Sequence, residues 1–288
     1  MQIVIKRKDS VASILLFLFN VFLVDRGITS IPLKKIFTLL GPFQKNETAI
    51  RMGLSREIQN GVLTNRKVDG EVIYCLTETA LTGFKYWMKT MDHDQQKIQL
   101  QFREWDGLWR LLLISKDTEM KSDWEYFYET LKQYSYGSLN RNLWISPYNY
   151  QKELIRLIGD SNLGSKIFFF ESRLSEEKDQ KELISEVWPI YKLNESYSLF
   201  LASFENEVKD LDLNAYQGGG GLPFLHRFGL DFFEIVRDDP HLPLRLLPVD
   251  WPGIKAAKAF RNIREEILPK ANRFINNILD EERMDFHD

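Results

Sequence analysis

Cysteine and histidine are scarce in this sequence of 288 residues. The single cysteine, Cys75, excludes an intramolecular disulfide framework and fits a reducing cytoplasm. The four histidines lie far apart, and none is spaced from cysteine or carboxylates as metal ligands are, so we expect no metal and no cofactor. The sequence holds no Gly-x-Ser-x-Gly segment, and the run Gly218 to Gly221 lacks the Lys-Ser/Thr of a phosphate-binding loop. These absences predict a protein that is not an enzyme and has no catalytic residues.

The apolar run from Ile14 to Val24 is too short to span a bilayer. Lys6-Arg7-Lys8 precedes it, as in a signal peptide, but a small-residue cleavage site is missing. We therefore expect this run to be the buried first helix of a cytoplasmic protein with no membrane partner. A chain anchored to a membrane by its N-terminus is the competing interpretation, which fractionation with membranes would support.

Charge is divided unevenly along the chain, whose net charge is −3. Residues 1–90 contain 13 Lys+Arg and 7 Asp+Glu, whereas the remainder contains 25 and 34. A basic N-terminal region therefore joins an acidic body. This asymmetry is expected if only one end of the protein meets a polyanion such as DNA, because neutralising phosphates supplies most non-specific affinity. A chance excess of solvated lysines is the alternative.

The segment from residue 30 to residue 60 has the pattern of a helix-turn-helix. Ser30, as a capping serine, and Pro32 open a helix that stops at Gly41-Pro42. Asn46 is the expected N-cap of a second helix that reaches Asn60, and such a second helix enters the major groove. Placing residues 100° apart gives this helix an inward stripe, which consists of Ile50, Gly53, Leu54, Ile58 and Gly61.

The opposite face of the second helix is polar and basic, and a hairpin follows it. Val62 to Asn65 and Val72 to Leu76 are β-prone runs on either side of Arg66 to Gly70, and Asp-Gly is a strong turn signal. Cations beside that turn suit a wing lying on phosphates. An ordinary surface helix also has a polar face, so the hairpin is what favours DNA contact. The expected DNA-binding residues are Lys45, Asn46, Thr48, Arg51, Met52, Ser55, Arg56, Gln59, Arg66 and Lys67.

We predict an α+β protein of three domains. Residues 1–91 form the winged helix-turn-helix, which closes with a helix from Thr77 to about Met91, and residues 92–97 are the linker. Residues 100–178 alternate strands and helices in the order βαββαβ, the ferredoxin-like arrangement, with a weak second strand near Ser135 to Asn140. Residues 179–288 form a helical C-terminal domain for effector binding or dimerisation, with a helix break at Pro189.

Four segments in the same order resemble the PaaX-like regulators, a family typified by the repressor of phenylacetic-acid degradation. Thr48 to Arg56 is similar to the family's recognition helix, Trp105 to Arg110 to its middle-domain opening, and Leu143 to Tyr148 to its later strand and turn. Asp239 to Pro243, together with Leu246 to Gly253, is similar to the family's C-terminal signature. Glu57 and the Gly218 to Gly221 run depart from the family's pattern.

The resemblance implies how such a protein works. It implies a winged helix, a central ferredoxin-like domain similar to that of the small CRISPR adaptation nuclease, and a helical C-terminal domain. It also implies a homodimer that represses a catabolic operon on a near-palindromic stretch of double-stranded DNA. Typical members release DNA on binding an aryl-coenzyme A thioester, such as phenylacetyl-coenzyme A or another acyl-coenzyme A.

A cationic stretch of the last helix and a nearby tryptophan are candidates for holding such an effector. The lysines and arginines would receive coenzyme A phosphates, and Trp251 would stack on an aryl or adenine ring. A solvated helix face beside a core tryptophan is the alternative. The candidate effector residues are His226, Arg227, Arg237, Trp251, Lys255, Lys258 and Arg261.

A metal-dependent nuclease built on the ferredoxin-like domain is the alternative function. Asp117 follows the first strand of that domain, close to where related nucleases place a metal-binding aspartate. It comes slightly late and has no obvious carboxylate partner, whereas metal-assisted phosphodiester cleavage needs several oxygen ligands. Asp238 and Asp239, which might pass for an acid/base pair, stand before Pro240 and are better interpreted as a turn.

Overall fold

The computed structural model describes residues 8–85, 98–115, 121–159, 167–174, 176–209 and 219–280. The chain divides into two compact units that do not follow its order. The first, here the N-terminal unit, comprises Met1–His93, Phe200–Glu234 and Lys255–Asp288, and the second, here the middle unit, comprises Asp94–Leu199 and Ile235–Ile254. The three longest helices described each contribute residues to both units: α8 (Ile190–Lys209), α9 (Gly221–Asp238) and α10 (Pro252–Asp280). The domain boundaries expected from the sequence remain predictions.

The expected first helix is present and buried. Helix α1 (Val11–Leu18) begins at Ser10, whose side chain accepts a hydrogen bond from the backbone N–H of Ser13. It continues as a π-helical segment, Phe19–Leu23, and a 3-10 turn, Val24–Arg26. Seven apolar side chains of this run are less than 8% exposed, which confirms its place in the core. They are Ile14, Leu15, Leu16, Leu18, Phe19, Phe22 and Leu23.

The start of the second helix differs from the expectation. Strand β1 (Ser30–Pro32) pairs antiparallel with β3 (Glu71–Leu76), and Ser30 lies opposite Cys75 in that ladder. Helix α2 (Leu33–Leu40) therefore begins after Pro32, which is its N-cap residue and makes no side-chain capping bond. Ser30 as a capping serine is thus wrong, because Ile31, at 0% exposed, anchors this segment in the sheet. The helix stops before the 3-10 turn Gly41–Phe43, as predicted.

Helix α3 (Glu47–Gln59) follows, and Asn46 is its N-cap, since its Oδ1 accepts the backbone N–H of Ala49 at 2.8 Å. Ile50 and Leu54 are buried, as expected of the inward stripe. A Cβ on Gly53 would lie 2.5 Å from the Cβ of Val11, so glycine permits the close approach of α1 and α3. Gly61 is not part of the stripe: it is exposed, lies beyond the helix and has a φ of +72°.

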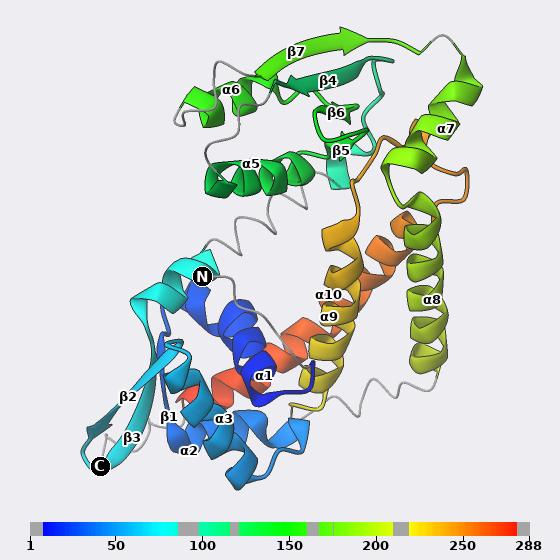
Figure 1. Cartoon of the computed structure of the whole chain (residues 1–288). Coiled ribbons are helices and arrows are strands. Elements are labelled where there is room, and N and C mark those ends of the chain that lie inside the picture. The colour runs from blue at the N-terminus through cyan, green and yellow to red at the C-terminus, as the bar shows by residue number, and fades with distance from the viewer. Residues whose placement is uncertain are drawn as a thin grey trace. The chain divides into compact units, whose positions relative to one another are not determined.

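The expected hairpin is confirmed. Strands β2 (Leu63–Val68) and β3 (Glu71–Leu76) pair antiparallel, and with β1 they form a three-stranded sheet in the order β1-β3-β2. Asp69 and Gly70 make the turn with φ angles of +48° and +88°. Figure 1 shows this hairpin in cyan, extending beyond the blue helices of the same unit. A helix over 78–85 follows, capped by the Thr77 hydroxyl. Its expected continuation to Met91 and the linker at 92–97 lie outside the described residues.

The middle unit holds the predicted βαββαβ order. Its elements are β4 (Trp109–Ile114), α5 (Lys121–Gln133), β5 (Gly137–Ser138), β6 (Leu143–Ser146), α6 (Gln151–Gly159) and β7 (Ile167–Ser172). The sheet order β5-β6-β4-β7, with every neighbouring pair antiparallel, is that of a ferredoxin-like fold. Leu112 and Ile114 of β4 pack with Phe127, Leu131 and other side chains of α5 and α6 in one core.

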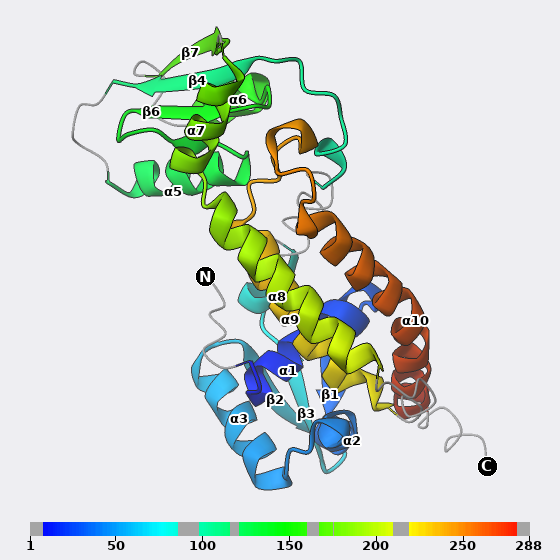
Figure 2. The same cartoon turned by 90° about the vertical axis from the view of Figure 1, so that its right-hand side faces the viewer.

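The remainder is helical, as expected (Figure 2). Helices α7 (Glu177–Val187) and α8 (Ile190–Lys209) are separated at Trp188 and Pro189. Helix α9 (Gly221–Asp238) precedes an irregular segment with the 3-10 turn Leu244–Leu246, and α10 (Pro252–Asp280) ends the described chain. Stacked phenylalanines join these helices within the N-terminal unit, for example Phe232 and Phe260 with ring centroids 4.4 Å apart.

Candidate nucleic-acid interface

Helix α3 carries a continuous exposed polar face. Thr48, Arg51, Met52, Ser55, Arg56 and Gln59 are all exposed, on the side of the helix away from Ile50 and Leu54. Met52 is 53% exposed, a large apolar side chain in an otherwise polar surface. Within the described part of the chain, Ser55, Arg56 and Gln59 have no side-chain hydrogen bond or ion pair. These groups are therefore available to base edges or phosphates, as a recognition helix requires.

Two contacts within the N-terminal unit orient the Arg51 side chain. Its guanidinium carbon lies 5.0 Å from the centre of the Phe37 ring on α2, and its Nη2 lies 3.8 Å from a Glu47 carboxylate oxygen one turn earlier. The side chain is still 55% exposed. A cation–π contact and an exposed ion pair are each worth about 1 kcal/mol or less, so a phosphate or a guanine can replace the Glu47 contact.

The hairpin presents its cations on a protruding strand. Every residue of β2 after Leu63 is exposed, including Arg66 and Lys67. Arg66 lies opposite Ile73 in the ladder and Lys67 opposite Val72, so successive cations project from opposite faces of the hairpin. A hairpin of this form beside α3 has the shape of a wing in a winged helix-turn-helix.

Lys45 is less available than the other expected contacts. Its side chain is 25% exposed, and its ammonium lies 3.8 Å from the Asp9 carboxylate. It also lowers the pKa of His226, a smaller cause than the burial of that ring. Lys45 therefore stabilises the base of the helix-turn-helix in this structure, and its contact with DNA remains a prediction.

Glu57 is a charged side chain on the inward side of α3, and the sequence analysis did not include it in the buried stripe. It is 7% exposed on the side of the helix facing α1, where apolar residues such as Leu15, Val62 and Phe84 line a small cavity with it. Burial raises the pKa of its carboxyl, and a hydrogen bond donated by the Asn60 amide at 3.2 Å partly opposes the rise. Glu57 points inward and is not a DNA contact.

Within the N-terminal unit, residues of the C-terminal helices make hydrogen bonds and ion pairs with the winged helix. Ser13 of α1 shares a hydrogen bond of 2.9 Å with the imidazole of His226 on α9, and both side chains are buried. The Lys8 ammonium lies 2.6 Å from the carboxylates of Asp231 and of Glu234. Lys35 of α2 donates to the backbone carbonyl of Leu279 on α10. The two helices that contact α3, α1 and α2, are thus themselves bonded to residues more than 200 positions away.

Comparison with known proteins places this architecture in a family. Residues 103–184 match the model of the PaaX protein central Cas2-like domain, and residues 188–277 match that of the PaaX-like protein C-terminal domain. The transcriptional repressor PaaX of Escherichia coli strain K12 is 25% identical over 235 residues, which cover 80% of this chain and 72% of that protein. This chain belongs to the PaaX-like family. The resemblance predicted from four sequence segments is confirmed.

The fold of the PaaX-like chain also has a solved counterpart. An uncharacterized protein from Mycobacterium tuberculosis matches it with a TM-score of 0.61 at 18% identity, over 92% of this chain and 99% of that one. At that identity the likeness bears on fold alone. It supports the α+β arrangement of winged helix, ferredoxin-like sheet and helical C-terminal region.

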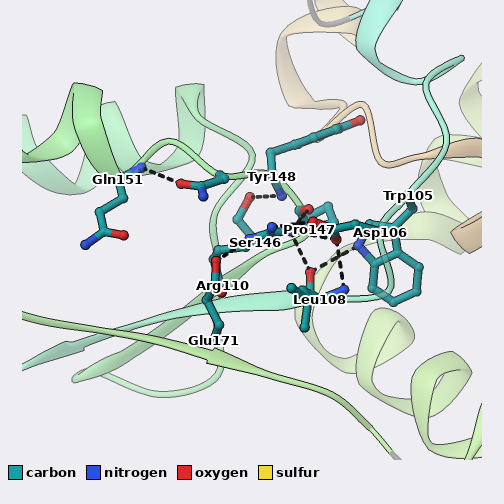
Figure 3. Close-up of polar contacts among 10 residues, drawn as sticks. Trp105, Asp106, Leu108, Arg110, Ser146, Pro147, Tyr148, Gln151 and Glu171 are labelled. Atoms are coloured by element: carbon teal, nitrogen blue, oxygen red, sulfur yellow. Dashed lines mark hydrogen bonds and ion pairs between the residues drawn. The ribbon is translucent and has the colours of Figure 1, made fainter.

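Trp105 to Arg110 is one of the four segments that resemble the family. Its Arg110 side chain links several parts of the middle unit. The Arg110 side chain, 10% exposed, makes paired hydrogen bonds with the Asp106 carboxylate and donates to the carbonyl oxygens of Leu108 and Pro147 at 3.0 and 3.1 Å (Figure 3). Its Nε lies 3.4 Å from Glu171 on β7. The hydrogen bond from Arg110 lowers the pKa of the Asp106 carboxyl. The sequence analysis missed this role of Arg110.

The C-terminal signature is structural too. Asp239 is 5% exposed and accepts hydrogen bonds from the Tyr197 hydroxyl at 2.8 Å and from the backbone N–H of His241 at 2.7 Å. The Tyr148 hydroxyl donates to the carbonyl oxygen of His241 at 2.5 Å. Asp239 therefore fixes the turn before Pro240, as expected of a turn residue.

The candidate effector residues are not gathered in one unit. His226, Arg227, Lys255, Lys258 and Arg261 belong to the N-terminal unit, and Arg237 and Trp251 to the middle unit. His226 is committed to Ser13, and Arg227 pairs with Glu207. Trp251 is 3% exposed and packs edge-on against Tyr197 at 5.8 Å, and its stacking on a ligand ring remains a prediction. The three cations of α10 are exposed, and their role remains a prediction.

No described residues support the nuclease alternative. Asp117, its candidate metal ligand, lies outside the described part of the chain. Within that part, no group of three or more His, Cys, Asp or Glu side chains is placed to hold a metal ion. The carboxylates of Asp106 and Glu171 each pair with Arg110. Similarity to a repressor favours a regulator over an enzyme.

Among the helices described, none has the length and apolar character needed to cross a membrane.

Proposed function

We propose that this PaaX-like chain is a sequence-specific transcriptional repressor of a catabolic operon. Helix α3 enters the major groove, where Arg51, Ser55, Arg56 and Gln59 contact base edges or adjacent phosphates, while Arg66 and Lys67 hold the backbone from the wing. The observation that carries this proposal is the exposed face of α3, on which Ser55, Arg56 and Gln59 lack side-chain partners in the described chain although the opposite face is buried. The named repressor of E. coli supports it by similarity.

A cytoplasmic homodimer would place two such helices on a near-palindromic operator. The two recognition helices of a two-fold dimer meet successive major grooves, so half-sites are expected about one helical turn apart or a multiple of that. An aryl-coenzyme A thioester such as phenylacetyl-coenzyme A would favour a dimer geometry that mismatches this spacing, which releases the DNA. The exposed cations of α10 are suited to coenzyme A phosphates.

Selection of bound duplexes from a random pool, followed by fluorescence anisotropy, tests DNA recognition directly. Arg56→Ala should weaken binding to the selected duplex about 10- to 100-fold, the loss expected for one base-reading arginine, and relax the preference at one position. Arg141→Ala, at an exposed arginine of the middle unit, is the matched control and should bind normally. A pool that yields no preferred sequence would overturn the proposal.

The effector is tested on the same duplex. Phenylacetyl-coenzyme A should release the protein from DNA, whereas free coenzyme A and phenylacetate alone should not. If none of these releases it, repression can stand but the aryl-coenzyme A effector cannot.

A further inference from the structure

Met52 lies at the centre of the exposed face of α3. It stands two positions after Ile50 and two positions before Leu54, the buried residues of the inward stripe. Two steps of about 100° turn its side chain about 160° away from each of them, directly opposite their midpoint. Its exposed fraction is 53%, in agreement with this outward direction. Met52 therefore points toward the floor of any groove that the helix enters with this face.

The neighbours of Met52 on this face are polar or cationic. Thr48 lies one turn before it, Ser55 and Arg56 lie one turn after it, and all three are exposed. A single exposed apolar side chain is common on protein surfaces. Here, however, it is surrounded by groups suited to base edges and phosphates, and no other exposed residue of α3 is apolar. The surroundings of Met52 therefore favour DNA over a protein partner.

The major groove of DNA displays one apolar group, the 5-methyl group of thymine, among hydrogen-bond donors and acceptors. A methionine side chain has no donor and only a weak acceptor, and its unbranched, flexible chain adapts to an apolar surface. Against a polar base edge Met52 would displace water without replacing its hydrogen bonds, which costs free energy. Against a thymine methyl group both surfaces leave water, which is favourable. The chemistry of Met52 therefore matches thymine among the four bases.

We propose that Met52 is a specificity-determining residue, which contacts the 5-methyl group of a thymine in the major groove. This inference rests on the proposed function, because only a helix seated in the groove brings this side chain to a base edge. Arg56 and Gln59 do not supply the same preference, since guanidinium and amide groups read hydrogen-bonding edges and not a methyl group. A 5-methylcytosine carries its methyl group at the same ring position, so methylation of a cytosine there should also strengthen binding.

A uracil scan of the selected duplex tests the contact with the full chain. Each thymine is replaced in turn by uracil, which removes the methyl group and leaves the Watson–Crick pair unchanged. At one thymine of each half-site the affinity of the wild-type protein should fall about 4-fold, the value of one buried methyl group. Cytosine at the same position should bind more weakly than thymine, and 5-methylcytosine should recover about 4-fold of that loss. Competition fluorescence anisotropy measures these ratios.

Variants of Met52 assign the methyl contact to this side chain. Met52→Ala should weaken binding to the thymine duplex about 4-fold and bind the thymine and uracil duplexes equally, so that the two changes are not additive. Met52→Leu keeps an apolar side chain of similar size and should retain most of the thymine preference. Leu199→Ala, the matched control, also truncates an exposed apolar side chain of a helix and should keep the full ratio of thymine to uracil affinity. Each ratio compares two duplexes with one protein, so a misfolded fraction cancels from it.

Two results would overturn the role of Met52 alone. A wild-type protein that selects an operator but binds every uracil duplex as tightly as the thymine duplex makes no methyl contact. A Met52→Ala variant that keeps the full thymine preference would assign the methyl group to another side chain. The repressor function stands in both cases. A protein that selects no duplex from the random pool would instead overturn the proposed function, and the methyl contact with it.

Discussion

Burial decides the role of each polar side chain near α3. Arg56 and Gln59 are exposed and without partners in the described chain, whereas Glu57 between them is buried against apolar neighbours. Helical periodicity placed Arg56 and Gln59 correctly, because a turn of about 100° per residue directs both side chains away from Ile50 and Leu54. The sequence analysis noted Glu57 only as a departure from the family's pattern, although the same periodicity places it on the inward side. The hydrogen bond from Asn60, three residues later, partly satisfies the buried carboxylate.

His226 was expected to bind an effector. In the structure it is buried and hydrogen-bonded to Ser13, and this should make the stability of the fold depend on pH. The pKa of this imidazole is lowered from 6.5 to about 4, chiefly by burial, with the hydrogen bond with Ser13 opposing the shift and the charge of Lys45 adding to it. Since the folded-state pKa lies below the unfolded one, the unfolded chain binds more protons between these values. The stability that neutral His226 provides is therefore present above pH 6.5 and lost as the pH falls toward 4.

The expected loss between pH 7 and pH 4 is at most about 3 kcal/mol, from 1.36 kcal/mol per pKa unit. Urea unfolding of the wild type and of His226→Gln, across this range, measures it. Glutamine keeps a hydrogen-bonding group for Ser13 but does not titrate, so the free energy of unfolding of His226→Gln should fall less steeply with acid. Parallel curves for the two proteins would show that His226 titrates normally in the folded state.

The hairpin and the ferredoxin-like strands were predictable as elements because their signals are local. Asp69-Gly70 specified the turn, and the positive φ angles of both residues are the reason that this pair is favoured there. Strand β1 was missed because the local pattern at Ser30 and Pro32 is that of a helix start. Pairing with β3, which lies about 45 residues later in the chain, overrides that pattern, and no local rule reports such a partner.

The wing should contribute affinity without specificity, because Lys67 lies on β2, whose side chains after Leu63 are all exposed. Lys67→Ala should weaken binding to selected and unselected duplexes by the same factor. It should also reduce the slope of log affinity against log salt by about 1, the value expected for one lost phosphate contact. Anisotropy titrations at several salt concentrations measure both quantities. A larger loss on the selected duplex would mean that the wing reads bases as well.

At the scale of the whole molecule, segments that are far apart in the sequence belong to the same compact unit. The sequence predicted a self-contained winged helix at the N-terminus and a separate helical domain at the C-terminus. In the structure Ser13 and His226, 213 positions apart, share a buried hydrogen bond, and most of α9 and α10 belongs to the unit of the winged helix. Contacts at that separation leave no periodicity or turn signal in the chain, so only the structure reveals them.

This division predicts which segments unfold together, and hydrogen exchange of the full chain can follow them. Ile14 of α1 is 1% exposed and Leu112 of β4 is 0% exposed, so replacing either by alanine should cost about 2–5 kcal/mol within its own unit. Ile14→Ala should lower the protection of α1 and of residues 221–234 in α9 by similar amounts, while β4, β6 and β7 keep theirs. Leu112→Ala is the matched control and should do the reverse. If Ile14→Ala left residues 221–234 as protected as in the wild type, the winged helix would be a separate cooperative unit. An effector bound to the C-terminal helices could then not change the position of α3 through these packing contacts.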